Sequence, residues 1–155
     1  MTTPDGLHDH LGYWLRRLSD EVHARFEALI GQYDVTASQW GVMASVFHGH
    51  VTTKAVARHM AIDPGAVSRL VDRLVAKSLI RREPDPASRR TVLLVLTDEG
   101  RALVPVLADL ADQNDAHFFG SLDAARRHQL EGWMRGLVGE IDSAPPRPAP
   151  SEESP

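Results

Sequence analysis

Cysteine is absent from the 155 residues of this chain. This excludes a disulfide framework, a zinc site built on thiolates and a thiol-based redox switch. Long apolar runs are also missing, because the longest covers only residues 92–96, whereas a membrane-spanning helix needs about 20 apolar residues. The N-terminal segment MTTPDGLHDH has neither a basic flank nor an apolar stretch. We therefore expect no signal peptide and a cytoplasmic location.

The motifs of common enzyme classes are missing as well. The sequence has no glycine-rich phosphate loop, no histidine–glutamate pattern of a metalloprotease and no serine nucleophile elbow. Its hydrophobic content of 43% and charged content of 25% are ordinary for a chain that folds around one core. We therefore expect a compact protein that is not an enzyme and needs no cofactor.

Charge is distributed unevenly along the chain. The net charge of −4 by itself disfavours nucleic acid as a partner. Residues 51–101, however, contain ten Lys or Arg against six acidic residues, whereas residues 1–50 contain three against six and residues 102–155 four against nine. A basic middle segment between acidic flanks is typical of a DNA-binding lobe on an acidic scaffold.

Helical periodicity covers the first part of the chain. Apolar residues at spacings of three and four predict a long helix over residues 7–30. Thr36 or Ser38 is expected to cap a second helix that is closed by Gly49. A third, short helix is expected to begin after residues 52–53.

A fourth helix is expected to follow after a break of three residues. Asp63 is suited to cap it, and Pro64 fits its first position, where a missing N–H costs nothing. Ile62 is expected to be buried in the turn before it. The third and fourth helices, joined by so short a turn, predict a helix-turn-helix.

The period changes in the next segment. Residues 80–83 and 91–96 have strand-like patterns, and residues 84–89 between them are rich in turn formers, which predicts a β-hairpin. The order helix, turn, helix and hairpin is that of a winged helix-turn-helix.

Two more helices are expected after the hairpin. Thr97 is expected to cap a fifth helix that reaches about Phe119 and is kinked or broken at Pro105. Ser121 is expected to cap a sixth helix. Residues 142–155 contain five prolines and no large apolar residue after Ile141, so we expect them to be disordered.

The outward positions of the fourth helix predict how the chain contacts DNA. Gly65 and Ala66 are small, so the start of the helix can enter the major groove closely. Ser68 can bond a phosphate or a base, and Arg69 can pair with guanine through two hydrogen bonds.

The hairpin adds cations at its tip. Arg89 and Arg90 are expected there, where one arginine can enter a narrow, electronegative minor groove. Arg81, Arg82 and Lys54 remain for phosphates, which fix the register without reading the sequence. The full set of candidate DNA-binding residues is Thr53, Lys54, Gly65, Ala66, Ser68, Arg69, Arg73, Arg89 and Arg90.

The stretch TTKAVARHMAIDPGAVSRLVDRLVAKSLIRREPDPASRRTVLLVLTDEG resembles the core of MarR-type regulators. It carries a Ser-Arg pair on the fourth helix, Leu-Ile-Arg-Arg at the start of the hairpin, paired arginines in the wing and a Leu-Thr-x-x-Gly helix start. The resemblance is close over residues 36–101 and extends over about 7–141.

The resemblance implies an intertwined homodimer that binds a pseudo-palindromic operator in double-stranded DNA. It places Ser68 and Arg69 on the recognition-helix contacts of the family and Arg89 on its minor-groove arginine. The chain departs from the pattern at two positions. Ser88 stands where an acid usually braces the wing, and Ser78 replaces the glycine that usually follows the recognition helix.

The predicted fold is therefore mainly α with a small β-wing, in which a winged helix-turn-helix lobe is joined to a helical dimerisation region. Residues 1–35 are assigned to an N-terminal dimerisation helix and residues 36–100 to the DNA-binding region. Residues 101–141 are assigned to C-terminal dimerisation helices, and residues 142–155 to the disordered tail.

The resemblance also implies that a small phenolic or carboxylated aromatic effector releases the repressor from DNA. His10, Trp14 and Arg17 form one stripe on the first helix, and Trp40 and Met43 on the second helix are candidates to complete a cavity. An indole wall with a guanidinium suits an aromatic carboxylate. In the alternative reading, Trp14 packs at the dimer interface and Arg17 pairs with an acidic residue three or four positions later.

Two further alternatives stay open. The segments His8-Asp9-His10 and His48-Gly49-His50 suggest a metal-responsive regulator of the same fold, although side chains two positions apart in a helix diverge and no third ligand set has matching spacing. We therefore assign no metal ligands. A winged helix can also be a protein-interaction module without ligand sensing, but such a module would not need arginines at the wing tip and on the recognition face.

Overall fold

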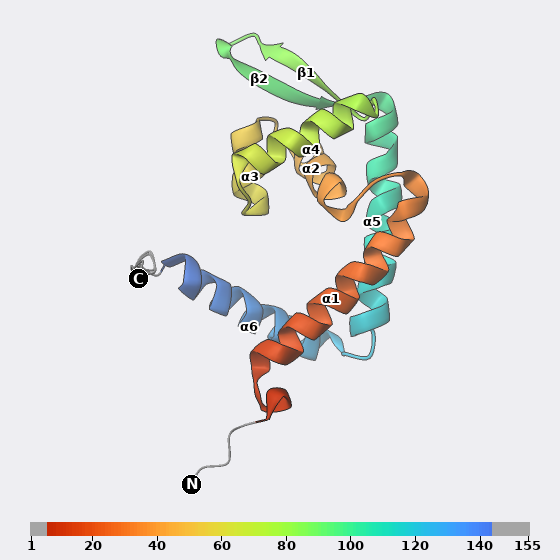
Figure 1. Ribbon diagram of the computed structural model, residues 1–155, viewed down its shortest axis with the longest axis vertical. Coiled ribbons are helices and arrows are strands. Elements are labelled where there is room, and N and C mark those ends of the chain that lie inside the picture. Colours follow the sequence, from red (N-terminus) through yellow and green to blue (C-terminus); the bar gives the residue numbers. More distant parts are fainter. Residues whose placement is uncertain (1–5, 144–155) are drawn as a thin grey trace, which may run out of the picture. The chain divides into compact units, whose positions relative to one another are not determined.

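The computed structural model describes residues 6–143, with side chains described as far as residue 139. It confirms the mainly α fold with a small β-wing (Figure 1). The elements in chain order are the 3₁₀ turn η1 (Leu7–Asp9), α1 (Leu11–Ile30), the 3₁₀ turn η2 (Gly31–Tyr33), α2 (Ala37–Phe47), α3 (Thr53–Met60), α4 (Pro64–Ala76), β1 (Ile80–Asp85), β2 (Ser88–Leu96), α5 (Asp98–Phe119) and α6 (Ala124–Ser143).

The chain divides into two compact units, residues 1–117 and residues 118–155. In the first unit, one continuous core joins the C-terminal end of α1 with α2, α3, α4, the base of the hairpin and α5. Its largest completely buried side chains include Ile30, Met43, Leu74, Ile80, Leu94 and Leu107. Burial of each such apolar side chain stabilises the fold by roughly 1.5–3 kcal/mol. The second unit contains α6.

Side-chain caps fix where the helices begin. The Thr36 hydroxyl accepts from the backbone N–H of Gln39, whose own side chain accepts from the N–H of Thr36, so a capping box starts α2. Asp63 accepts from the N–H of Ala66 at 3.1 Å, with Pro64 at the first position of α4. These two starts were predicted, as was the cap of α5, where the Thr97 hydroxyl accepts from the N–H of Gly100.

The turn of the helix-turn-helix differs from the prediction in one respect. Ala61 adopts a left-handed conformation (φ 54°), and the N–H of Ile62 donates to the carbonyl of Ala57. The side chain of Ile62 is 36% exposed, so its predicted burial is wrong. Val56 on α3 and Val67 on α4 are completely buried in the core.

The hairpin is longer than predicted. β1 and β2 are antiparallel, with Ile80 opposite Leu96 and a bulge between Pro84 and Asp85. Proline is tolerated there because this is a two-stranded edge, where not every N–H is needed for pairing. The N–H of Leu94 also donates to the carbonyl of residue 51 at 2.8 Å, which ties the base of β2 to the loop before α3.

Three other expectations about the helices are corrected. The first helix begins at Leu11, because an extended residue separates it from the turn η1. α5 runs as one helix through Pro105, whose side chain is exposed, so the helix is not broken there. Asp123, and not Ser121, caps α6, since its carboxylate accepts from the N–H of Arg126 at 2.8 Å.

The predicted tail overlaps the end of α6. Residues 142 and 143 belong to this helix and not to the tail, and the rest of the predicted disordered tail, residues 144–155, lies outside the described residues. None of the helices in the described part of the chain is both long and apolar enough to cross a lipid bilayer.

Candidate nucleic-acid interface

The exposed face of α4 carries the predicted recognition residues. Arg69 and Arg73 are exposed on it and Ser68 is half-buried. A Cβ added at Gly65 would lie 2.7 Å from the carboxylate of Asp63 and 3.7 Å from Nη1 of Arg69. A larger residue at position 65 would therefore disturb the cap, and the guanidinium of Arg69 extends toward the start of the helix.

Two hollows lie on either side of the turn before α4. One is lined by Ser38, Ile62, Ala66, Arg69, Leu70 and Arg73. The other is lined by Lys54, Ala57, Arg58, Ala61, Ile62, Asp63 and Pro64. Exposed Ile62 lines both hollows, and both are bordered by arginines. Four of the nine candidate residues line them, namely Lys54, Ala66, Arg69 and Arg73.

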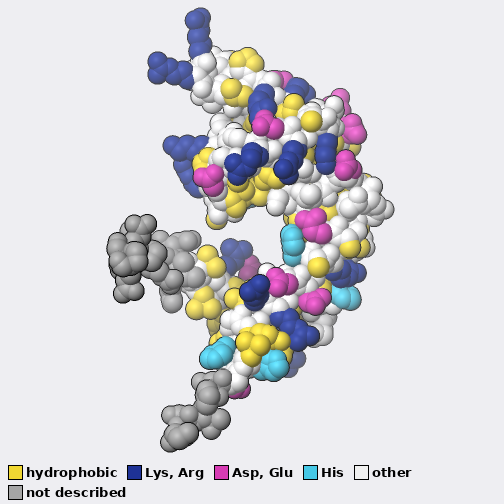
Figure 2. Space-filling view, viewed as in Figure 1, with side chains coloured by type: hydrophobic (Ala, Val, Ile, Leu, Met, Phe, Trp, Pro, Cys, Tyr) yellow, Lys and Arg dark blue, Asp and Glu magenta, His cyan; other side chains and the backbone are white. Residues whose placement is uncertain are grey.

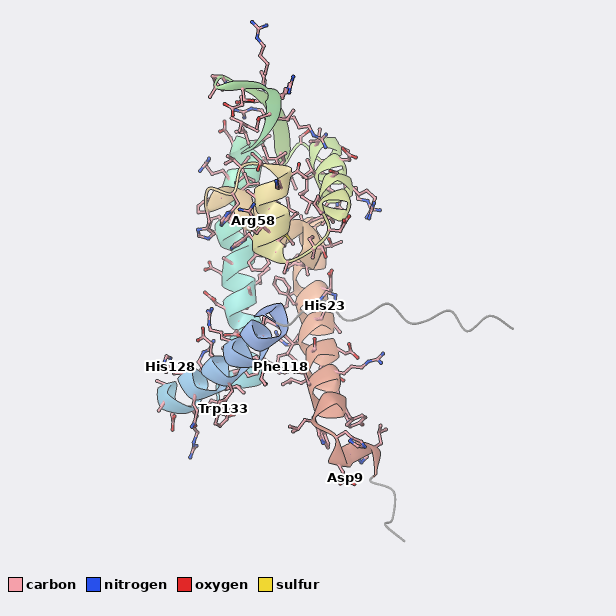
Figure 3. The ribbon with its side chains drawn as sticks, turned by 90° about the vertical axis from the view of Figure 1, so that its left-hand side faces the viewer. Asp9, His23, Arg58, Phe118, His128 and Trp133 are labelled. Atoms are coloured by element: carbon pink, nitrogen blue, oxygen red, sulfur yellow. The ribbon has the colours of Figure 1, made fainter. Side chains whose placement is uncertain are left out.

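Sequence reasoning missed Arg58 as a member of this surface. It lies on α3 (labelled in Figure 3) and borders the same hollow as Lys54. The signal was available, because residues four apart share one face of a helix. Thr53, the first residue of α3, is half-buried.

The wing tip is ordered by short polar contacts. The carboxylate of Asp85 accepts from the N–H of Ala87 at 2.9 Å, and the hydroxyl of Thr91 donates to that of Ser88 at 3.1 Å. Ser88, which stands where an acid usually braces the wing, thus contributes a hydrogen bond to the tip instead of an ion pair. Arg89 and Arg90 follow the turn, at the start of β2, and both are exposed as predicted.

Arg81 and Arg82, which were expected to contact phosphates, each form an ion pair within the chain. Arg81 donates to Glu83 at 2.6 Å on the same strand, and Arg82 donates to Asp72 on α4, also at 2.6 Å. Their charges are therefore already neutralised within the chain.

Six other cations of this lobe form no ion pair within residues 6–143. None of the salt bridges there involves Lys54, Arg58, Arg69, Arg73, Arg89 or Arg90. Figure 2 shows dark-blue Lys and Arg side chains at the hairpin tip and over the helices of this lobe. Exposed, unpaired cations are suited to phosphate contacts.

The candidate effector residues of α1 surround a different surface. Trp14 is 48% exposed, and its Nε1 donates to the carbonyl of His8 at 2.8 Å. Arg17 donates to the hydroxyl of Tyr13 at 3.4 Å. Arg16, and not Arg17, pairs with Asp20 (3.7 Å), so the alternative pairing of Arg17 is not present.

The candidates on α2 do not join this surface within one chain. Met43 is completely buried in the core, and Trp40 packs edge-to-face on Phe26 with ring centroids 5.2 Å apart. Phe26 lies twelve residues after Trp14 on α1, which corresponds to about 18 Å along the helix. His10 is exposed before the start of α1. The Nε1 of Trp40 is buried without a hydrogen-bond acceptor.

The histidine segments do not converge on a metal-like arrangement. His50 stacks on His59 with centroids 4.1 Å apart, and Nδ1 of His59 lies 2.9 Å from the hydroxyl of Ser45. Across residues 6–143, no group of three or more His, Asp or Glu side chains could hold a metal ion.

On α6, a hydrogen bond and the positive charge of Arg135 hold the pKa of the Glu131 carboxyl below its ordinary value.

A helix-turn-helix with a cation-tipped hairpin defines a winged-helix DNA-binding protein. A family model described as the MarR family matches residues 33–91. The chain is 27% identical over 143 residues to the transcriptional repressor NicR of Pseudomonas putida, covering 92% of this chain and 90% of NicR. It is 32% identical over 105 residues to the multiple antibiotic resistance protein MarR of Escherichia coli, covering 64% of this chain and 73% of that protein.

A solved structure of BpsR from Bordetella bronchiseptica, which concerns regulation of its DNA binding by 6-hydroxynicotinic acid, has a TM-score of 0.77. The two sequences are 30% identical, and the match covers 92% of this chain and 100% of the BpsR chain. The chain belongs to the MarR family of winged-helix transcriptional regulators.

Proposed function

We propose that this protein is a homodimeric transcriptional repressor that binds a pseudo-palindromic operator and is released from it by a small hydroxylated aromatic carboxylate. The observation that carries the DNA-binding part is the exposure of four arginines without salt-bridge partners in residues 6–143. Two, Arg69 and Arg73, lie on α4, and two, Arg89 and Arg90, lie at the hairpin tip. Because the target is chromosomal DNA, we place its action in the cytoplasm.

Apolar side chains left exposed by the single chain support the dimer. The turn η1 exposes Leu7, and the N-terminal half of α1 exposes Leu11, Leu15 and Leu18, of which Leu11 is 87% exposed. On α6, Trp133, Met134, Leu137 and Val138 are exposed. Apolar faces of this kind mark sites that another chain covers. A two-fold dimer presents its recognition helices to successive major grooves, about 10 base pairs apart.

The chemistry of Arg17 and Trp14 supports the effector. The guanidinium of Arg17 is exposed, and its long hydrogen bond to Tyr13 is weaker than a charge-assisted bond to a carboxylate would be. The exposed indole of Trp14, on the preceding turn of the helix, offers a face on which an aromatic ring can stack. BpsR, which is regulated by 6-hydroxynicotinic acid, supports this ligand class.

Trp40 is a second location for the effector. A buried indole N–H without an acceptor is costly, and a ligand hydroxyl or carboxylate at this position would satisfy it. Since the single chain separates Trp40 from Arg17, the two locations need separate variants.

The test is footprinting and fluorescence anisotropy with the DNA upstream of the protein's own gene. We expect protection of two half-sites about one helical turn apart, and weaker binding when 6-hydroxynicotinic acid is added. Protection of a single unrepeated site by a monomer would contradict the dimer. An absence of specific DNA binding would favour a protein-interaction module, and unchanged affinity with every aromatic acid would contradict the effector.

A further inference from the structure

Asp72 and Arg82 connect the recognition helix to the wing. Nη2 of Arg82 on β1 donates to Oδ1 of Asp72 on α4 at 2.6 Å, and the two groups form an ion pair. Asp72 lies between the two exposed arginines of α4, at positions 69 and 73. Among the ion pairs of residues 6–143, this pair alone joins α4 itself to the hairpin.

The outer half of the hairpin has few other supports. Its base is anchored by the buried side chains of Ile80 and Leu94. Arg82 pairs with Leu94 across the sheet, so it stands where the buried base ends. Beyond this pair, residues 83–93 depend on strand pairing and on the polar contacts of the tip. A two-stranded hairpin is marginally stable by itself, so its direction depends on such ties to the body of the protein.

Asp72 is a negatively charged residue on the surface that we expect to face DNA. Its side chain is 64% exposed on a face otherwise suited to phosphates, and an unpaired carboxylate there would repel DNA. Arg82 neutralises this charge and is itself 40% exposed. An exposed ion pair adds little to folding stability because water and salt screen it. Its contribution therefore lies in the direction of the wing and in the charge of the interface.

We infer that Asp72 and Arg82 are positioning residues, which hold the wing at the angle that lets α4 and the wing arginines contact the same half-site. This inference rests on the proposed DNA-binding function and adds a specificity-determining pair that need not touch DNA.

A positioning role and a purely electrostatic role of Asp72 predict opposite changes in operator affinity for Asp72→Asn. Removing a negative charge from the interface would by itself tighten binding to every DNA sequence. If the pair positions the wing, the same substitution lowers affinity for the selected sequence relative to random DNA. The loss should be about tenfold, the size expected when one base-reading contact is misplaced.

The experiment uses a duplex that the wild-type protein selects from a randomised library, together with a scrambled duplex. Anisotropy gives the affinity for each, and hydroxyl-radical footprinting reports minor-groove protection by the wing. The variants are Asp72→Asn, Arg82→Gln, their combination and the conservative Arg82→Lys. Arg81→Gln is the matched control, because it removes the same charge from the same strand without a tie to α4. Thermal unfolding of each variant checks that the fold is retained.

We expect Asp72→Asn and Arg82→Gln each to lose specificity and wing protection with unchanged unfolding midpoints. The double variant should lose no more specificity than the more impaired single variant, because both substitutions break the same contact. Arg82→Lys should retain most of the specificity. Tighter binding of Asp72→Asn at unchanged specificity, or an equal loss for Arg81→Gln, would overturn the inference alone. Failure of the wild type to select any duplex would overturn the proposed function and the inference with it.

Discussion

Arg69 is the residue from which we expect the largest contribution to sequence reading, because its guanidinium extends toward the N-terminal end of α4, which we expect to enter the groove. Arg69→Ala should weaken operator binding by about 1–3 kcal/mol and relax the preference at one base pair per half-site. Competition with single-base variants of the operator measures both effects. Arg16→Ala, an exposed arginine on α1, is the control. An equal loss on all sequences would reassign Arg69 to phosphate contacts.

Arg89 is expected to act mainly through charge. Arg89→Ala should weaken binding and reduce the slope of log affinity against log salt by about one for each protomer, since a phosphate or minor-groove cation is lost. Titrations at several salt concentrations, with Arg90→Ala in parallel, measure the slope. Unchanged affinity and slope for Arg89→Ala would show that the wing assignment is incorrect.

At single positions, local chemistry was predictable and tertiary partners were not. Asp63 and Thr97 were identified as caps because a cap depends on residues three positions away. The burial of Ile62 was mispredicted because Val56 and Val67 compete for the same interior, which no local pattern reveals. The pairing of Arg82 was missed because its partner is ten residues away in the chain.

At the scale of the helix, the end of α4 is strained by Ser78, whose φ is 58°. Glycine adopts this left-handed conformation without the steric cost of a Cβ, although it gains entropy in the unfolded chain. We expect Ser78→Gly to raise the free energy of unfolding by roughly 0.5–1 kcal/mol. Ala76→Gly, at the last residue of α4, should lower it instead, because glycine gains entropy in the unfolded chain without relieving a left-handed backbone. Urea denaturation measures both, and a destabilised Ser78→Gly variant would contradict the strain argument.

A buried amide joins α1 to α5 within the first unit. Asn114 is 4% exposed, its Nδ2 donates to the carbonyl of Val22 at 3.0 Å, and its Oδ1 accepts from Arg25 at 3.1 Å. Asn114→Ala should lower the free energy of unfolding by about 1–3 kcal/mol, because buried partners lose their hydrogen bonds. Gln113→Ala, an exposed neighbour, should change it by less than ~0.5 kcal/mol. Equal effects in calorimetry would exclude the link.

Elements were predicted where one periodicity dominated, and misjudged where two signals conflicted. The hairpin was predicted too short because Pro84 and Asp85 are turn formers, yet both belong to β1 beside its bulge. A kink or a broken turn was expected at Pro105, but α5 runs through this residue without a break. In both cases neighbouring contacts outweigh one unfavourable residue, which intrinsic propensity alone does not show.

For the whole molecule, the resemblance indicated the lobe and its DNA contacts, and the effector site remained the least determined part. The five candidate residues were grouped because they suit an aromatic acid. Within one chain, Trp14 and Arg17 lie on the N-terminal half of α1, whereas Trp40 packs near its C-terminal end. Met43 is buried in the core. A ligand site that depends on a second chain cannot be read from the spacing within one sequence.

The response to effector is therefore tested at both locations. A ligand releases the operator only if it prefers a dimer whose recognition helices no longer match the two half-sites, and a tenfold loss of affinity requires about 1.4 kcal/mol of coupling.

We expect Arg17→Ala to abolish the response to 6-hydroxynicotinic acid while ligand-free operator affinity stays within about threefold, since an exposed substitution costs little. Arg16→Ala, with its guanidinium already paired to Asp20, is the matched control and should respond like the wild type. Trp40→Phe keeps the packing on Phe26 but removes the unpartnered N–H. Anisotropy titrations with the acid compare the three variants. A response lost in Trp40→Phe and retained in Arg17→Ala would place the effector beside α2, because only the indole donor would then be required.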